Sequence, residues 1–154
     1  RLKKEATFLS EDEQITYYFD SEEDLRIQKN KLFSKIWLKK GNIHDEHREE
    51  LEIQVPRDDF EKLEKLFMAL GYTVSIQWFR KRHTFVWGDI KVMLDFTRGY
   101  GYILELEKVV SPEEQESTVE HLKTLMQKLG ITLTPKEEFD TKYQHYKKHW
   151  RKLV

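Results

Sequence analysis

Alternation of apolar and polar residues runs through most of this chain. In the stretch HREELEIQV, residues 47–55, Leu51, Ile53 and Val55 alternate with charged or amide side chains. Because successive side chains of a β-strand point to opposite faces, such a segment has one apolar and one polar face. The sequence predicts about seven strands, here and at 17–20, 24–28, 35–41, 78–86, 90–97 and 102–109.

Apolar residues at helical spacing predict three helices, within the segments 56–72, 111–131 and 135–153. The second has the clearest start, because Ser111 is a good N-cap and Glu114 can close a capping box. The first ten residues resemble the end of a helix. There is no internal repeat and no linker, so the pattern predicts one α+β domain over residues 1–154, with the C-terminal helix 135–153 packed on it.

Charge and composition limit the kinds of partner. The 154 residues include 27 basic and 28 acidic ones, so a bulk attraction to nucleic acid or to an anionic membrane is not expected. Any site for an anion must be local. No cysteine is present, which excludes disulfides and thiolate chemistry, and no membrane span or signal peptide is visible. We expect a cytoplasmic protein, either a monomer or a homodimer.

The charged faces of the predicted strands allow two interpretations. The first is an ordinary antiparallel sheet whose polar face meets water. The second follows from the sorting of the charges, because some strands carry Arg or Lys while others carry Glu-x-Glu pairs. If the sheet curls into an antiparallel β-barrel of about eight strands flanked by helices, these charges gather inside it. The cations would be Arg26, Lys35, Lys39, Arg48, Arg80, Arg82 and Lys91, and the carboxylates Glu50, Glu52, Asp95, Glu105 and Glu107.

A barrel interior with so many charges needs partners for them, since unpaired buried charges are costly. Guanidinium and ammonium groups match phosphate oxygens. Carboxylates two residues apart on a strand, with Cα atoms roughly 7 Å apart, can converge on a hard cation such as Mg²⁺ or Mn²⁺. The pattern therefore predicts a site for a polyphosphate and its divalent metal.

In their order along the chain, these segments resemble the CYTH domains of the triphosphate tunnel metalloenzymes, which include class IV adenylyl cyclases and thiamine and inorganic triphosphatases. The block in which Asp95 precedes RGYG and Glu105-x-Glu107 is similar to the family's D-x-v-x-x-L-G-x-f-x-E-x-E pattern. The resemblance is firm from Gln14 to Glu107. Its segments are QITYYFD, DLRIQ, IWLKKG, HREELEIQV, a helix ending in LGY, FRKRHTF and IKVMLDFTRGYGYILELE, followed by a helix.

The resemblance implies a barrel whose tunnel binds a triphosphate and one or two metal ions. It implies phosphate binding by Arg26, Lys39, Arg48, Arg80, Arg82 and Lys91. It implies Mg²⁺ or Mn²⁺ binding by Glu50, Glu52, Glu105 and Glu107, and catalytic roles for Asp95, Glu105 and Glu107. Asp95 could alternatively pair with a tunnel arginine.

The activity implied first is a metal-dependent phosphohydrolase acting on a nucleotide or inorganic triphosphate, with ATP, inorganic triphosphate and thiamine triphosphate as candidates. The alternatives are a class IV-type adenylyl cyclase, a non-catalytic polyphosphate or nucleotide binder, and a plain structural sheet. In a triphosphatase, water attacks a terminal phosphorus. In a cyclase, ribose O3′ attacks the α-phosphorus, and cyclic AMP and pyrophosphate result.

Two features depart from the family pattern. The signature Glu-x-Glu-x-Lys strand, which would precede RLKKEATFLS, is not in this sequence, so the first strand of the barrel is expected to lie outside it. Gln28 stands where many members have a second arginine. Separately, His145 and His149 have the i, i+4 spacing that can chelate a transition metal, but no third ligand is evident, and a solvated helix face is the favoured interpretation.

Overall fold

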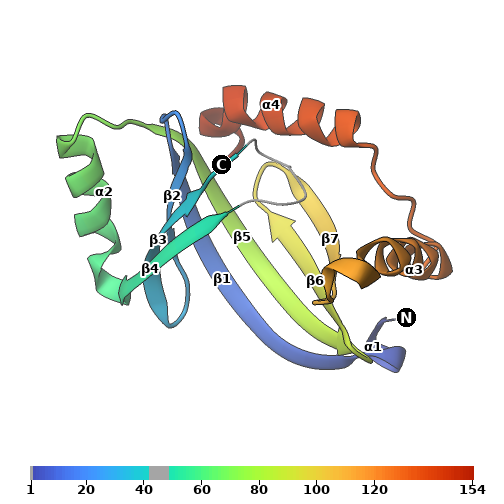
Figure 1. Cartoon of the computed structure of the whole chain (residues 1–154). Helices are drawn as coiled ribbons and strands as arrows, with labels where there is room; N and C mark the ends of the chain where they lie inside the picture. The colour runs from blue at the N-terminus through green and yellow to red at the C-terminus, as the bar shows by residue number, and fades with distance from the viewer. Residues whose placement is uncertain (1, 42–48) are drawn as a thin grey trace.

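Seven strands form one antiparallel sheet in the computed structural model, which describes residues 2–41 and 49–154 (Figure 1). The order across the sheet is β4-β3-β2-β1-β5-β6-β7. The predicted strands are all present, although their ends differ. The strands are β1 Thr7–Phe19, β2 Asp24–Lys29, β3 Phe33–Lys39, β4 Glu50–Pro56, β5 Val74–Trp87, β6 Ile90–Thr97 and β7 Gly101–Glu107.

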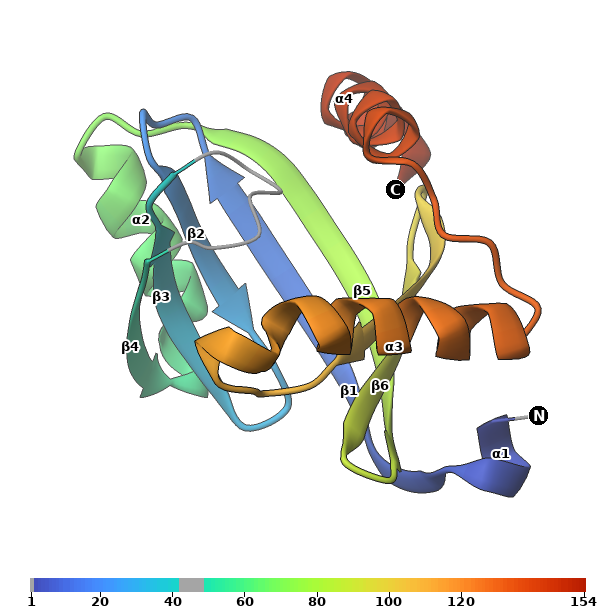
Figure 2. The ribbon, with the colours of Figure 1, turned by 45° about the vertical axis from the view of Figure 1, so that its right-hand side comes forward.

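The predicted eight-stranded barrel is confirmed only in part. Within the described residues there are seven strands, β4 and β7 are the two ends of the strand order, and closure into a barrel is not shown. The sheet is nevertheless strongly curved and coiled (Figure 2). Long twisted strands such as β1 and β5 curve in this way because each strand rotates relative to its neighbour. The curvature gives the sheet an inner and an outer face.

Strand β1 is much longer than the predicted segment 17–20. A short helix, α1 Leu2–Glu5, precedes it, so the predicted helical end covers only the first residues and the strand begins at Thr7. The polar run in this region lacks apolar alternation, which is why the sequence did not indicate a strand. Its partners explain the structure, because β1 pairs with β5 almost throughout, and Glu11 Oε1 lies 2.9 Å from Lys81 Nζ across the pair.

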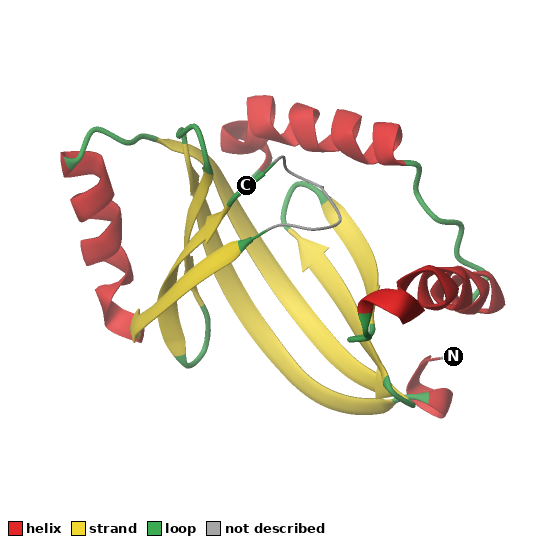
Figure 3. Ribbon diagram, in the orientation of Figure 1, coloured by secondary structure: helices red, strands yellow, loops and turns green. Residues whose placement is uncertain are grey.

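The three predicted helices are confirmed (Figure 3). They are α2 Phe60–Ala69, α3 Gln115–Lys128 and α4 Lys136–Leu153, and short 3₁₀ turns, η1 Arg57–Asp59 and η2 Pro112–Glu114, lead into the first two. The predicted capping box is present, with the Ser111 backbone N–H donating to Glu114 Oε2 at 3.4 Å. Among the described residues, no helix combines the length and the apolar character that crossing a bilayer requires.

Helices α2 and α3 cover two parts of the outer face. Phe60 and Leu63 of α2 pack with Phe19 and Ile27 of the sheet. At the other end, Leu125 of α3 joins a second cluster of buried residues, Phe85, Ile90 and Val92. The apolar faces that the alternation predicted are therefore the outer faces, as burial of apolar area requires.

Helix α4 packs on the inner face. Tyr143, Tyr146 and Trp150 form a buried cluster with Ile76 and Trp78 of β5. Two side chains also bond to the backbone of β5, since Tyr146 Oη donates to the Gln77 carbonyl at 2.7 Å and Trp150 Nε1 donates to the Ser75 carbonyl at 2.8 Å. The aromatic stripe predicted for the tail thus holds α4 across one end of the sheet.

The turn between β6 and β7 touches the end of α4, and a glycine there should be essential for stability. At Gly99, φ is +74° and a Cβ would lie 2.6 Å from Leu153 Cβ. At Gly88, φ is +64° and a Cβ would meet nothing within 4 Å. We predict that Gly99→Ala lowers the free energy of unfolding by about 1–3 kcal/mol more than Gly88→Ala, measured by urea denaturation. Equal losses would contradict this contact.

Candidate functional site

The inner face of the sheet and helix α4 enclose a cavity of about 520 Å³. Among the described residues, four cations and three carboxylates line it, although the whole chain has a net charge of only −1. The charged side chains are Arg26, Lys39, Arg80, Arg82, Glu50, Glu105 and Glu107. The sequence-based expectation that opposite charges gather inside a curved sheet therefore holds for these seven residues.

Strand periodicity brings these residues together. On β5, Trp78, Arg80 and Arg82 are two positions apart, so all three point into the cavity. Glu105 and Glu107 share the inner face of β7 by the same rule. Pairing with β6 then sets the positions along the strands, because Arg82 lies opposite Asp95 while Glu105 and Glu107 lie opposite Met93 and Lys91.

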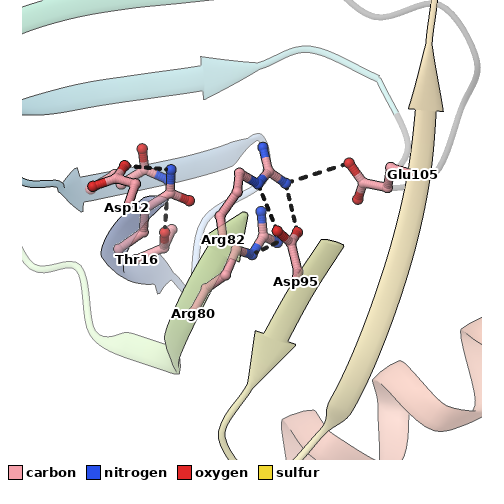
Figure 4. Close-up of polar contacts among 8 residues, drawn as sticks. Asp12, Thr16, Arg80, Arg82, Asp95 and Glu105 are labelled. Atoms are coloured by element: carbon pink, nitrogen blue, oxygen red, sulfur yellow. Dashed lines mark hydrogen bonds and ion pairs between the residues drawn. The ribbon is translucent and has the colours of Figure 1, made fainter. Parts of the chain in front are cut away.

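Asp95 lies beneath the two arginines of β5 and is completely buried (Figure 4). Its carboxylate accepts two hydrogen bonds of 2.7 Å from Arg82, through Nε and Nη2. Arg80 Nε is 3.4 Å from Asp95 Oδ2, in a geometry that does not make a hydrogen bond. Arg82 Nη2 also lies 3.5 Å from Glu105 Oε2. Asp95 thus forms the arginine pair that the sequence left open as an alternative.

Arg82 keeps its charge although its side chain is largely shielded from water. Burial lowers the pKa of a guanidinium, but the hydrogen bonds and charge of Asp95, together with the charges of Glu105 and Glu107, raise the pKa of Arg82 above its ordinary value. A cation that remains charged without full hydration is suited to binding an anion.

Arg26 is held from several sides. Its guanidinium donates to Asp24, with Nε at 2.7 Å from Oδ1 and Nη2 at 2.5 Å from Oδ2. Its Cζ lies 4.2 Å from the ring centroid of Tyr18 and 5.3 Å from that of Trp37. These contacts fix the direction of a side chain that is only 9% exposed, so Arg26 is pre-oriented at the cavity wall.

Strand β3 continues this wall with Trp37, which lies opposite Arg26 in the register of β2 and β3. Its indole Nε1 donates to Glu50 Oε2 at 3.1 Å, and Lys39 Nζ lies 3.3 Å from Glu50 Oε1. The ammonium groups of Lys35 and Lys39 lie 4.1 and 4.0 Å from the ring centroid. Glu50 therefore neutralises a cation and orients an aromatic ring, in addition to facing the cavity.

The remaining predicted site residues are placed differently. Glu52 pairs with Lys35 at 3.0 Å and is not among the cavity-lining residues. Lys91 lies opposite Glu107 in the strand register, but its side chain is exposed and does not line the cavity. Arg48 lies outside the described residues. Phosphate or metal binding by these three residues stays a prediction.

Sequence reasoning missed the aromatic side chains of the cavity. Alternation placed Trp37 and Trp78 on the charged faces but suggested no role for them. The complete set is Tyr18, Trp37, Trp78, Phe139 and Tyr143. The last two come from α4, and their spacing indicated a packing stripe. Only the docking of α4 on the inner face makes them part of the site.

Gln28 lies inside the cavity, in the position that the resemblance assigns to an arginine. It is buried, and its Nε2 donates to Thr16 Oγ1 of the neighbouring strand at 3.1 Å. A neutral pair of an amide and a hydroxyl group therefore occupies this part of the wall. The positive charge of the cavity is carried by Arg26 on the same strand and by Lys39, Arg80 and Arg82 on β3 and β5.

The carboxylates present fit a hard divalent cation only in part. Glu105 and Glu107 offer oxygen ligands from one face of β7, which is the chemistry that Mg²⁺ and Mn²⁺ prefer. Within residues 2–41 and 49–154, no three His, Asp or Glu side chains converge as a metal-binding group. Mg²⁺ is commonly held by one or two carboxylates together with substrate phosphates and water, and this arrangement matches that pattern.

The histidine pair of α4 lies outside the cavity. The ring centroids of His145 and His149 are 4.6 Å apart, as expected for the i, i+4 spacing. In the described part of the chain, no metal-binding group of three side chains includes them. Transition-metal binding by this pair is untested.

Comparison with known proteins identifies a family pattern in this sequence. The sequence pattern of the CYTH domain matches residues 1–139. A Methanocaldococcus jannaschii protein named "putative adenylate cyclase" is 30% identical over 86 residues, which are 55% of this chain and 48% of that protein. The match therefore spans about half the length of that relative.

Solved structures share the fold. A Pyrococcus horikoshii protein has a TM-score of 0.69 at 26% identity, over 82% of this chain and 78% of that one. A second P. horikoshii protein gives 0.71 at 22% identity, over 85% and 82%. A Vibrio parahaemolyticus protein, also titled a "putative adenylate cyclase", gives 0.62 at 18% identity, over 88% and 84%. With the family pattern matching most of its length, this chain belongs to the CYTH domain family.

Proposed function

We propose that this protein is a metal-dependent phosphohydrolase that acts on a nucleotide or inorganic triphosphate. The observation that carries the proposal is one cavity into which, in the described part of the chain, four cations from three strands and three carboxylates from two strands point. Such a set matches a polyanion bound with its divalent counter-ion, because the cations can bind phosphate oxygens and the carboxylates can bind the metal ion. Membership of the CYTH family supports the same proposal.

The cations are placed to bind the phosphate chain. Arg80 and Arg82 stand side by side on β5, and Arg26 and Lys39 come from β2 and β3. Planar guanidinium groups donate two hydrogen bonds at once, so the arginines can fix the direction of a phosphoryl group as well as its charge. Asp95 is a positioning residue, because it contacts Arg82 and does not line the cavity.

Glu105 and Glu107 are the residues that would hold Mg²⁺ or Mn²⁺. A bound divalent ion neutralises phosphate oxygens and polarises the phosphorus centre. Glu105 already lies 3.5 Å from Arg82, so metal and arginine would meet the same phosphoryl group from neighbouring positions. We assign no side-chain base, since phosphoryl transfer depends mostly on positioning and charge neutralisation.

An adenylyl cyclase is the second candidate. Two of the relatives carry that activity in their names, and the same cavity would bind the triphosphate of ATP. A non-catalytic binder of nucleotide or polyphosphate is the third. With ATP the products separate all three, because hydrolysis of the terminal phosphate releases orthophosphate, cyclisation releases cyclic AMP and pyrophosphate, and a binder releases neither.

The first prediction concerns the products. Incubation with ATP, GTP, inorganic triphosphate and thiamine triphosphate, each with Mg²⁺ or Mn²⁺, should release orthophosphate, measured with a colorimetric assay. The release should stop when EDTA removes the metal. Pyrophosphate together with cyclic AMP would overturn hydrolysis in favour of cyclisation. Tight triphosphate binding without any product would leave only the binding role.

The second prediction concerns the carboxylates of β7. Glu105→Gln and Glu107→Gln should each lower kcat by about 100-fold, because the amide is a weaker metal ligand, and should raise the Mg²⁺ concentration needed for half-maximal rate. Glu61→Gln is the matched control. Glu61 is on α2, away from the cavity, and its carboxylate lies 3.0 Å from Lys29 Nζ. Unchanged metal dependence in both β7 variants would contradict the assignment.

The third prediction concerns Asp95. Asp95→Asn leaves Arg80 and Arg82 without their buried counter-charge, and should lower the free energy of unfolding by roughly 3–5 kcal/mol. Inorganic triphosphate should restore part of the lost Tm, because it binds the folded state and supplies negative charge. Asp89→Asn is the control, since Asp89 is exposed and pairs with Lys108 at 2.8 Å. A Tm unchanged in Asp95→Asn would show that the buried pair contributes little.

A further inference from the structure

Helix α4 has an exposed side that carries two histidines. Tyr146 and Trp150 are buried against the sheet, whereas His145 and His149 are exposed and lie one helical turn apart. The centroids of the two imidazole rings are 4.6 Å apart, and the ring planes differ by 44°. Neither ring lines the charged cavity, so the proposed phosphohydrolase reaction makes no use of this pair.

The spacing of the rings matches that of two imidazoles bound to one metal ion. An imidazole nitrogen lies about 2.0–2.1 Å from Zn²⁺, and the centre of the ring lies roughly 1 Å behind that nitrogen. At nitrogen–metal–nitrogen angles of about 90–110°, two such rings have their centres roughly 4.5–5.2 Å apart. The 4.6 Å between His145 and His149 falls within this range. The helix backbone therefore already holds both rings at the spacing of a chelate.

The helix is anchored to the sheet next to each histidine. Tyr146 and Trp150 directly follow His145 and His149, and their side chains donate hydrogen bonds of 2.7 and 2.8 Å to backbone carbonyls of β5. An ion that binds this pair does not have to order the backbone first, and ordering a backbone costs conformational entropy. Preorganisation of this kind favours binding.

The surroundings of the pair do not repel a cation. A groove along α4 is lined by both histidines and by further side chains of the same helix. Its charged members are two ammonium groups and two carboxylates, so their formal charges cancel; they are Lys136, Lys148, Glu137 and Asp140. The groove is open to solvent, so water can complete the coordination of an ion that two rings bind.

We propose that His145 and His149 form a second metal site, which binds Cu²⁺, Ni²⁺ or Zn²⁺ through one nitrogen of each ring. Imidazole suits these ions, whereas Mg²⁺ and Mn²⁺ prefer oxygen ligands, so the site differs in chemistry from the carboxylates of β7. Within residues 2–41 and 49–154, no third His, Asp or Glu converges on the pair. The remaining coordination positions are therefore open to water or to an added ligand.

Calorimetric titration with CuCl₂ tests the proposal on the full chain, with any purification tag removed and in a buffer that does not chelate metals. The wild type should show a Cu²⁺ site that weakens at least tenfold in His145→Ala and in His149→Ala, because each change leaves a single imidazole. NiCl₂ and ZnCl₂ should bind the same site less tightly than CuCl₂. Titration with MgCl₂ should not distinguish the variants from the wild type.

The matched control is His121→Ala. His121 is also an exposed histidine on a helix, α3, but it has no second histidine one turn away. This variant should leave the Cu²⁺ affinity unchanged. Equal affinities of the wild type and of the double variant His145→Ala/His149→Ala would overturn the proposal.

A rescue variant separates chelation from an indirect effect. Thr141 is exposed, lines the same groove and lies four residues before His145. The double variant Thr141→His/His149→Ala moves the pair by two turns of spacing rules but keeps it at i, i+4, so its Cu²⁺ affinity should return to within threefold of the wild type. A rescue variant that folds, as its circular dichroism melt verifies, but binds no better than His149→Ala would overturn the proposal.

A thermal melt gives a second readout. Because the ion binds the folded helix, NiCl₂ should raise the Tm of the wild type more than the Tm of His149→Ala. Equal shifts in Tm would contradict binding to the folded α4. Neither measurement needs a substrate, so the result is independent of the proposed hydrolysis.

Discussion

The buried carboxylate of Asp95 is the constraint on which the site depends. Two arginines side by side on one strand repel each other and lose hydration when a sheet curves around them, so they need a counter-charge on a neighbouring strand. Asp95 supplies it at complete burial, with two hydrogen bonds of 2.7 Å to Arg82 and a looser contact to Arg80. Arg82 is therefore fixed, while Arg80 keeps hydrogen-bonding capacity for a ligand.

The other cations of the cavity are also paired with carboxylates. Arg26 is held by Asp24, and Lys39 is held by Glu50, which also orients Trp37. Each cation has a carboxylate partner on its own strand or an adjacent one. Because its cations are paired, the cavity has few unpaired charges when no ligand is bound. A cation can still replace part of its contact with a carboxylate by a contact with a phosphate oxygen. Such preorganisation lowers the cost of binding a polyanion.

Helix α4 links the stability of the fold to the shape of the site. Its aromatic stripe is anchored on β5 by Tyr146 and Trp150, and its end rests against the turn at Gly99. Phe139 and Tyr143 reach the cavity from the same helix. A helix that looks like simple packing in the sequence thus forms the aromatic end of the site.

The sequence by itself determined which residues share a face. Strand alternation placed Arg80 with Arg82 and Glu105 with Glu107, and helical spacing gave α2, α3 and α4, because these patterns follow from the fixed geometry of each element. It did not determine the length of β1, whose polar residues are stabilised by partners such as Lys81 on β5.

Tertiary structure decided how those faces meet. Strand pairing shows that Asp95 serves the arginines, and the docking of α4 brings Phe139 to the cavity, whereas Glu52 and Lys91 do not line it. The reason is physical, since side-chain direction along one element is set by local geometry, whereas contacts between elements depend on register, sheet curvature and helix docking, which the whole chain determines together.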